Sequence, residues 1–245
     1  MPPNTCLYNM ADAVVIQLPR LVGRQAESWK ALIEIAPTLG KHWILVGGQM
    51  VFLHEVERRA TNIRPTDDID VVVDLRVEPT GLDRIHQVLT SADFVQDWPS
   101  PEGLAHRYRR SGAAIDVLAP DHIGKRATLL LGAGRTIEAP GTTQAFARSS
   151  VVQVELASGG SALIRRPTLI GAMLGKVAAV TEIVSMSAAE RAKHLRDVDA
   201  LARLIGPDDR DGVALSRSER SALARIVVAT ELSPLAAASI RLLIT

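Results

Sequence analysis

The chain lacks several residue patterns, and each absence excludes a class of protein. Its 245 residues include one cysteine, Cys6, so no disulfide can form within the chain, and nothing indicates an oxidising compartment. No apolar run reaches the roughly 18 residues that a membrane-spanning helix needs. The N-terminus lacks the basic and apolar regions of a signal peptide. We therefore expect a cytoplasmic protein with no membrane partner.

Aromatic residues and excess charge are also scarce. Phe, Trp and Tyr make up 3% of the chain, and the formal net charge is +1. The core should therefore consist of Leu, Val, Ile and Ala, and the length is sufficient for a large one. A near-neutral total does not indicate a nucleic-acid binder, although it is compatible with a local basic patch. The shortage of aromatic rings leaves little surface on which single-stranded bases could stack.

Hydrophobic periodicity predicts alternating helices and strands in the first half of the chain. The expected helices cover residues 22–39, 49–59 and 81–94. The expected strands cover residues 43–48, 69–75, 106–110 and 113–120. Short connections between such elements are typical of a mixed α/β sheet. Residues 121–160 are less regular, with short apolar segments around Gly-rich turns.

From Pro167 onward the pattern becomes helical. We expect Pro167 to begin a helix, because proline is favoured at the first helical position. Ser187 and Glu190, and likewise Ser216 and Glu219, have the spacing of capping boxes at helix starts. The predicted fold class is therefore α/β (α+β). A mixed sheet with flanking helices would occupy residues 1–165, and a helical bundle residues 166–245.

A pair of glycines, Gly47 and Gly48, falls between an expected strand and an expected helix. Glycine lets the backbone approach a ligand closely, and a helix N-terminus favours anions such as phosphate. The pair matches neither the G-x-G-x-x-G motif nor a P-loop. A tight strand-to-helix turn with no ligand is the alternative.

Three aspartates accompany the expected strands. Asp68 and Asp70 lie on one face of a strand start, where two carboxylates suit a hard cation such as Mg²⁺. A solvated strand end would explain them equally well. Asp116 interrupts an otherwise apolar strand, so it needs a partner. It either completes a three-carboxylate cluster or forms a salt bridge with an arginine such as Arg107 or Arg109.

The order of these motifs resembles the nucleotidyltransferase superfamily of the polymerase-beta type. More specifically, the sequence from Gly47, GGQMVFLHEV, and the sequence from Arg64, RPTDDID, are similar to AbiEii/MenT-type toxins of abortive-infection and toxin–antitoxin systems. The resemblance implies a nucleotidyltransferase-type sheet domain that transfers a nucleotide from an NTP with the help of Mg²⁺. Two features depart from the pattern. Gly48 stands where many members have serine, and Asp67 is an additional carboxylate with no assigned role.

Two residues of the helical half match the same family. Lys176 lies in an apolar helix, and Asp197 follows a basic residue in the next helix. Lys176 could clamp a triphosphate, or its stem could cover apolar surface while its ammonium stays in water. Asp197 could pair with Lys176, orient the base or metal-bound waters, or form a surface pair with Lys193 or Arg196.

The resemblance assigns a role to each candidate residue. The expected metal ligands, for a site of two Mg²⁺ ions, are Asp68, Asp70 and Asp116. The expected nucleotide-binding residues are Gly47, Gly48, Arg64, Thr66 and Lys176. The expected catalytic residues are Asp68, Asp70, Lys176 and Asp197. Arg64 could instead hold its own loop in place.

The acceptor follows only from the resemblance, which implies the 3′ end of tRNA or a protein hydroxyl, together with a cognate antitoxin. Several basic residues could contact RNA phosphates, or could be ordinary solvated charges. They are Arg107, Arg109, Arg110, Arg165, Arg166, Lys193 and Arg196. A small-molecule nucleotidyltransferase and a non-catalytic nucleotide-binding protein are the alternative functions.

Overall fold

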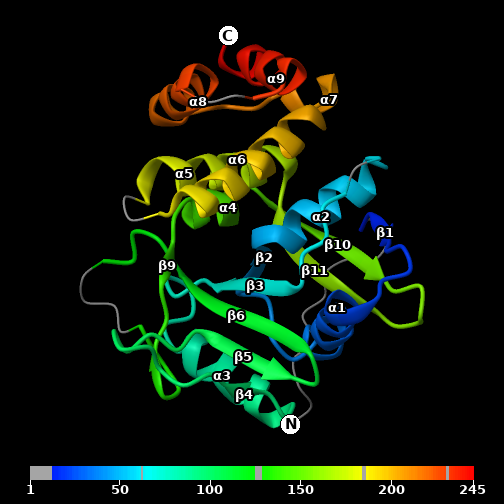
Figure 1. Cartoon of the computed structure of the whole chain (residues 1–245), viewed down its shortest axis with the longest axis vertical. Coiled ribbons are helices and arrows are strands. Elements are labelled where there is room, and N and C mark those ends of the chain that lie inside the picture. Colours follow the sequence, from blue (N-terminus) through cyan, green and yellow to red (C-terminus); the bar gives the residue numbers. More distant parts are fainter. Residues whose placement is uncertain (1–12, 62, 125–128, 184–185, 230–231) are drawn as a thin grey trace.

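The computed structural model describes residues 13–61, 63–124, 129–183, 186–229 and 232–245 (Figure 1). Cys6 lies outside them. The chain is mixed α/β, with mixed sheets and a helical region at its C-terminal end, so the predicted fold class is confirmed. In Figure 1 the helices α5 and α6 lie between the central sheet and the C-terminal helices α8 and α9. No helix among the described residues is long and apolar enough to cross a membrane.

The central sheet contains parallel and antiparallel neighbours. Its strands, in spatial order, are β2 (Trp43–Val46), β3 (Asp68–Val73), β6 (Ala113–Pro120), β5 (Arg107–Arg110) and β4 (Val95–Gln96). β3 runs parallel to β6, whereas the other neighbours on this path are antiparallel. The short strand β9 (Glu138–Ala139) extends β6. The four strands expected before residue 121 are therefore all present, β6 with the expected ends and the other three with shifted ends.

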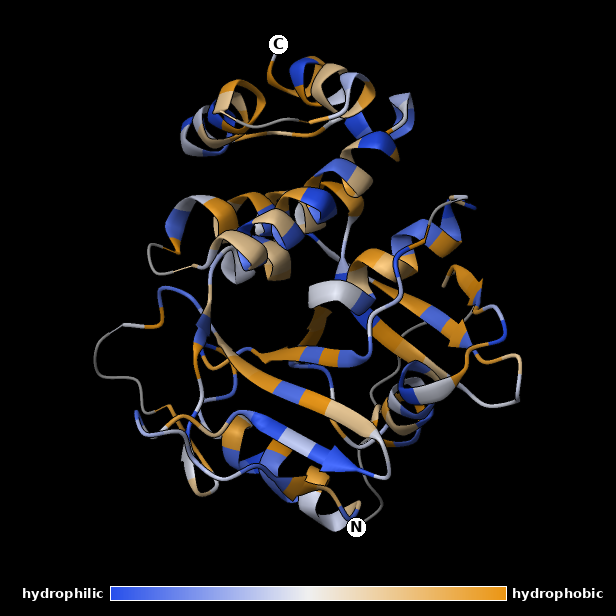
Figure 2. Ribbon diagram, viewed as in Figure 1, coloured by the Kyte–Doolittle hydropathy of each residue, from blue (hydrophilic) through white to orange (hydrophobic). Residues whose placement is uncertain are grey.

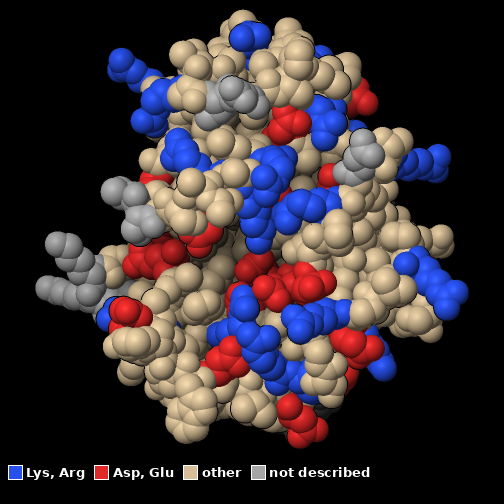
Figure 3. Space-filling view, in the orientation of Figure 1, with Lys and Arg blue, Asp and Glu red and all other residues tan. Residues whose placement is uncertain are grey.

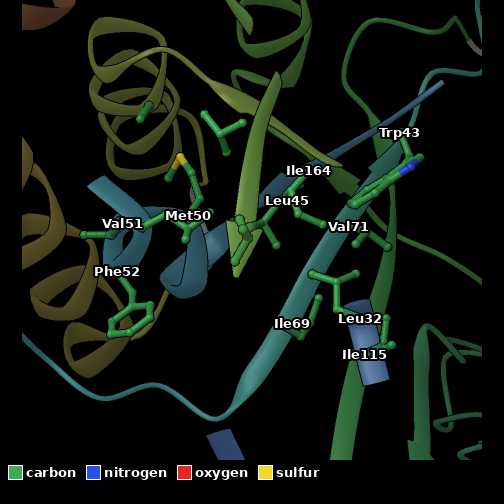
Figure 4. Packing of buried hydrophobic residues seen from close by; sticks show 14 of the residues in the cluster. Leu32, Trp43, Leu45, Met50, Val51, Phe52, Ile69, Val71, Ile115 and Ile164 are labelled. Carbon is green, nitrogen blue, oxygen red and sulfur yellow. The ribbon is translucent and has the colours of Figure 1, made fainter. Parts of the chain in front are cut away.

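Side chains alternate between the two faces of β3, as the period of a strand requires. Ile69 is fully buried and packs in the same cluster as Leu32 of α1 (Gly23–Ile35) and Ile115 of β6 (Figure 4). Asp68 and Asp70 therefore project from the opposite face. Figure 2 shows this alternation along β3, and shows β5 as largely hydrophilic beside a largely hydrophobic β6.

Further helices frame the sheet, and two small sheets complete the first part of the chain. The helices are α2 (Gly47–Glu57), α3 (Gly81–Ser91) and α4 (Thr142–Ala147). One small sheet consists of β1 (Val15–Gln17), β10 (Ser149–Glu155) and β11 (Ser161–Pro167). The other is the hairpin of β7 (Leu130–Leu131) and β8 (Gly134–Arg135).

Pro167 does not begin a helix, so that expectation is wrong. It is the last residue of β11 and pairs with Ser149 of β10. Thr168 caps the following helix instead, because its hydroxyl accepts a hydrogen bond from the Gly171 amide at 3.3 Å. The expected domain boundary at residue 165 thus falls within β11, two residues before the chain leaves the sheet.

The C-terminal helices continue the core of the sheet region. They are α5 (Leu169–Glu182), α6 (Ala188–Arg203), α7 (Pro207–Arg210), α8 (Arg217–Ala229) and α9 (Pro234–Ile244). Met173 and Val198 belong to the same buried cluster as Ile69. Because buried apolar area supplies most of the stabilisation, this shared core holds the helices against the sheet. The two capping boxes are confirmed, since Glu190 and Glu219 accept the amides of Ser187 and Ser216.

Candidate functional site

The turn between β2 and α2 is shaped by its two glycines. Gly47 has a φ of +68°, and a Cβ atom at this residue would lie 1.7 Å from Oδ2 of Asp70. A Cβ atom at Gly48 would lie 2.6 Å from Oγ1 of Thr66. Glycine is therefore required at both residues, at Gly47 also for backbone conformation. The turn brings the start of α2 against the Asp70 carboxylate and the Thr66 hydroxyl.

Gln49 fixes this turn, and sequence reasoning missed its role. Its side chain is fully buried and accepts a hydrogen bond of 2.7 Å from the indole nitrogen of Trp29. Its amide nitrogen donates to the carbonyl oxygen of Thr66. The loop before β3 is thereby tied to α2 and α1. A polar residue that follows two glycines at an otherwise apolar helix start was the available signal.

The carboxylates of β3 and β6 lie in register. Asp70 pairs with Asp116 across the parallel strands, and Asp68 lies one pleat away on the same face as Asp70. Burial and, next, the negative charge of the neighbouring Asp116 raise the pKa of Asp70 to about 6. Asp68 is the accessible member, because 42% of its side chain is exposed. Asp67 is also exposed, and the structure gives it no role.

Asp116 forms a salt bridge with Arg107, which is one of the two roles that the sequence left open for it. Arg107 lies opposite it on β5 and donates from Nε to Oδ1 at 2.7 Å and from Nη2 to Oδ2 at 2.6 Å. The same Nη2 also donates to Oδ2 of Asp68 at 3.0 Å. These hydrogen bonds raise the pKa of Arg107 further above its already high value. Arg109, the other candidate partner, is bound by Asp97 instead.

The three aspartates do not form a compact cluster of metal ligands. Among the described residues, the group whose ligand atoms all lie within 4.8 Å of one another is Asp121, His122 and Glu182. This group could hold a metal ion. Its one buried member, Asp121, already accepts hydrogen bonds from the amides of Gly141 and Thr143 at 2.6 and 2.8 Å, at the start of α4. The three aspartates of β3 and β6 thus share their face of the sheet with Arg107, and their use as metal ligands stays a prediction.

Lys176 and Asp197 form a buried ion pair between α5 and α6. Nζ of Lys176 lies 2.8 Å from Oδ2 of Asp197, with only 8% and 2% of the two side chains exposed. Arg64 donates to the other oxygen, Oδ1, at 2.9 Å. Burial acts to raise the pKa of Asp197, but the charges of Lys176 and Arg64 outweigh it and lower that pKa. The ammonium of Lys176 therefore does not lie in water, and Asp197 does not form a surface pair with Lys193 or Arg196.

A cavity of about 360 Å³ joins these elements. It is lined by residues of the sheet half and of α5, among them Gly47, Gly48, Asp70, Asp116 and Lys176. Apolar side chains, such as those of Ile137, Ala172 and Ala179, belong to the same lining. His194 also lines it, and burial together with Lys176 lowers the pKa of this histidine to about 4, so its imidazole is neutral at pH 7. The cavity therefore has both charged and apolar walls.

A second cavity, of about 740 Å³, also reaches Gly48. It lies between α2 and α6 and is lined by Glu55, Arg64 and Asp197 and by three arginines of α6, Arg191, Arg196 and Arg203. Burial raises the pKa of Glu55 to about 7, and the negative charge of Asp197 adds to this shift. Figure 3 shows basic side chains gathered above an acidic patch near the middle of this face.

Most of the basic residues expected to contact RNA are bound within the protein. Arg110 pairs with Glu34, and Arg166 is buried, where it pairs with Glu57. Arg107 and Arg109 are paired as described above. Lys193 and Arg196 are exposed and line the smaller and the larger cavity respectively.

Comparisons with family models, with curated proteins and with solved structures found no significant match to this chain.

Proposed function

We propose that the chain is a Mg²⁺-dependent nucleotidyltransferase. The observation that carries the proposal is the smaller cavity, where Gly47, Gly48 and Asp70 of the sheet half meet Lys176 of the helical half. These are the residue types that bind a phosphate chain and a hard cation, and they come from segments more than 100 residues apart. The apolar side chains in the same lining could pack against a nucleobase.

The phosphates of an NTP would lie at the start of α2. Backbone N–H groups at this end of a helix point outward and favour negative charge. Lys176 adds a positive charge from the opposite wall, where Asp197 holds its side chain in place. Arg64 and Thr66 position the loop before β3, so their contribution is to hold the site in shape.

Asp68 and Asp70 are the residues that would hold the cation. The raised pKa of Asp70 fits this role, because its carboxylate lies among like charges that a divalent cation would offset. When bound, Mg²⁺ would stabilise negative charge on the reacting phosphate and activate the incoming hydroxyl. The carboxylates fix where that charge is located.

The acceptor is proposed from the second cavity and from the resemblance to AbiEii/MenT-type toxins. The arginines of α6 around that cavity suit an acceptor with phosphates, such as the 3′ end of tRNA. Gly48 lines both cavities, so an acceptor in the larger one would reach the phosphates in the smaller one. A cytoplasmic toxin with a cognate antitoxin is the biological role that the resemblance implies.

A label-transfer experiment tests this function. The purified chain is incubated with Mg²⁺, total tRNA and each α-labelled NTP in turn, beside an Asp70→Asn variant. Asp83→Asn is the matched control, because Asp83 is an exposed aspartate of α3. We expect label on tRNA with the wild type and the control, and none with Asp70→Asn. Label on protein would show that the acceptor is a protein and not RNA. Equal labelling by Asp70→Asn and wild type would contradict the role assigned to Asp70.

A further inference from the structure

Arg107 contacts both Asp116 and Asp68. Its guanidinium supplies a positive charge that a second metal ion would otherwise supply to the three carboxylates. It is held opposite Asp116 by the register of β5 and β6, and one of its nitrogens also reaches Asp68. We infer that Arg107 is a built-in second cation. The site then binds one divalent ion, on Asp68 and Asp70, and Asp116 serves to position Arg107. This inference rests on the proposed use of a divalent cation by the same site.

The hydrogen bonds of Asp116 carry the inference. Both of its oxygens accept from Arg107, at 2.7 and 2.6 Å, and the residue is only 6% exposed. A two-pronged arginine–carboxylate pair is among the strongest charge-assisted contacts in proteins. A metal ion on this carboxylate would have to share both oxygens with the guanidinium and lie close to its positive charge, or displace it and leave a partly buried positive charge without its partner. Asp116 is therefore a poor metal ligand while Arg107 is present.

The balance of charge at the site points the same way. Asp68, Asp70 and Asp116 bring three negative charges to neighbouring strands, and the burial of Asp116 makes its repulsion with Asp70 costly. One guanidinium and one divalent ion neutralise them. Arg107 uses one oxygen of Asp68, Oδ2, which leaves the other oxygen of this accessible residue to a metal ion.

Cation stoichiometry tests the inference without any need for activity. Mn²⁺ is titrated into the full chain, with His122→Ala present throughout so that the group of Asp121, His122 and Glu182 does not add a bound ion, and the free ion is measured by electron paramagnetic resonance. We expect one tightly bound Mn²⁺ per wild-type chain and two per chain in Arg107→Ala. Arg109→Ala is the matched control, because Arg109 lies on the same strand but pairs with Asp97, so it should bind one ion. Two ions in the wild type would overturn the inference.

A second variant keeps the test decisive if Arg107→Ala fails to fold. Asp116→Asn removes the proposed positioning residue without removing a ligand. Its affinity for Mn²⁺ should therefore fall by no more than the roughly 10- to 100-fold that outer groups cost, whereas loss of a direct ligand should exceed that range. A loss of that larger size would make Asp116 a metal ligand and overturn the inference.

Failure of the inference and failure of the proposed function are distinguishable. One bound Mn²⁺ with no label transfer to any acceptor would uphold the single-cation site and contradict the transferase. Two bound Mn²⁺ with label transfer would contradict the single-cation site and uphold the transferase. No bound Mn²⁺ would overturn both.

Discussion

At the scale of single residues, Gly47 carries the tightest constraint in the site. Its backbone is left-handed, and the space beside it is filled by the Asp70 carboxylate. Gly103 shares the left-handed backbone, with a φ of +78°, but not the crowding, because a Cβ atom there would meet nothing within 4 Å. A comparison of the two glycines therefore isolates the effect of crowding Asp70.

We predict that Gly103→Ala lowers the free energy of unfolding by about 1–2 kcal/mol, the strain of a left-handed alanine. Gly47→Ala should cost more than this, because its methyl group must also displace Asp70. It should also weaken Mn²⁺ binding by roughly tenfold or more, which Gly103→Ala should not do. Denaturant unfolding and Mn²⁺ titration measure the two effects. Equal losses in both variants would contradict the crowding argument.

Glu55 gives the chain a pH-dependent stability. Its pKa rises from an ordinary value near 4.5 to about 7 because it is buried near Asp197. The folded chain therefore binds more protons than the unfolded chain between these pH values, so stability falls as pH rises through this window. The loss is at most about 3 kcal/mol, since one pKa unit corresponds to about 1.4 kcal/mol.

Glu55→Gln should remove this part of the pH dependence. Its free energy of unfolding should be flatter than that of wild type between pH 4.5 and 7, as measured by urea unfolding at each pH. Glu102→Gln is the control, because Glu102 is exposed and its pKa is lowered rather than raised. A Glu55→Gln curve parallel to that of wild type would show that Glu55 does not titrate in this window.

Local sequence predicted some site residues and not their partners. The phase of a strand placed Asp68 and Asp70 on one face, and the lone charge in an apolar strand marked Asp116 as paired. Periodicity could not choose between a metal and Arg107, because that depends on the register of β5 against β6. The contact between Arg64 and Asp197 joins residues 133 positions apart, and no local pattern encodes it.

At the scale of elements, the capping box of α6 has a clear physical basis. The Ser187 hydroxyl accepts the Glu190 amide at 3.2 Å, and the Glu190 carboxylate accepts the Ser187 amide at 2.9 Å. This box begins the helix that carries Asp197. We predict that Ser187→Ala lowers the free energy of unfolding by about 1 kcal/mol.

Denaturant unfolding measures this loss, and Ser158→Ala is the control. Ser158 lies in the exposed turn between β10 and β11, outside any helix. Its replacement should change stability by less than about 0.5 kcal/mol. Equal effects of the two substitutions would show that the box does not stabilise α6.

Regular elements were predictable where one local signal dominated. The strand at residues 113–120 appears with its predicted ends, and the strand at 69–75 and the box-capped helices appear with ends shifted by a few residues. The prediction of a helix start at Pro167 was wrong because proline suits a strand end as well as a helix start. Its pairing with Ser149 makes it the end of β11. The short helix α4 was missed because Asp121, 21 residues earlier, caps it through the amides of Gly141 and Thr143.

At the scale of the whole molecule, the ion pairs of Asp197 join the two halves of the chain. Asp197 on α6 binds Lys176 on α5 and Arg64 in the loop before β3. Removing one partner of a buried pair leaves the other without compensation, which costs about 3–5 kcal/mol. We predict a loss of this size in Asp197→Ala, because Lys176 stays buried while the half-exposed Arg64 can reach water.

The double variant Lys176→Met, Asp197→Leu separates stability from function. Two apolar residues of similar volume can replace a buried ion pair at little cost, so its stability should return to within about 1 kcal/mol of wild type. Label transfer should nevertheless be absent from the double variant, because the positive charge of Lys176 is missing from the cavity. Thermal and denaturant unfolding measure the first effect. A double variant as unstable as Asp197→Ala would show that the pair itself supplies net stability.

The proposed function requires that a nucleotide bound in the smaller cavity is transferred to an acceptor and not merely held. The most direct measurement supplies the chain with Mg²⁺, tRNA and one NTP labelled either on the α- or on the γ-phosphate. Nucleotide transfer predicts that the α-label becomes attached to the acceptor while the γ-label leaves as pyrophosphate, and that Asp70→Asn does neither. Attachment of the γ-label would indicate phosphoryl transfer, and no attachment of either label would contradict the claim.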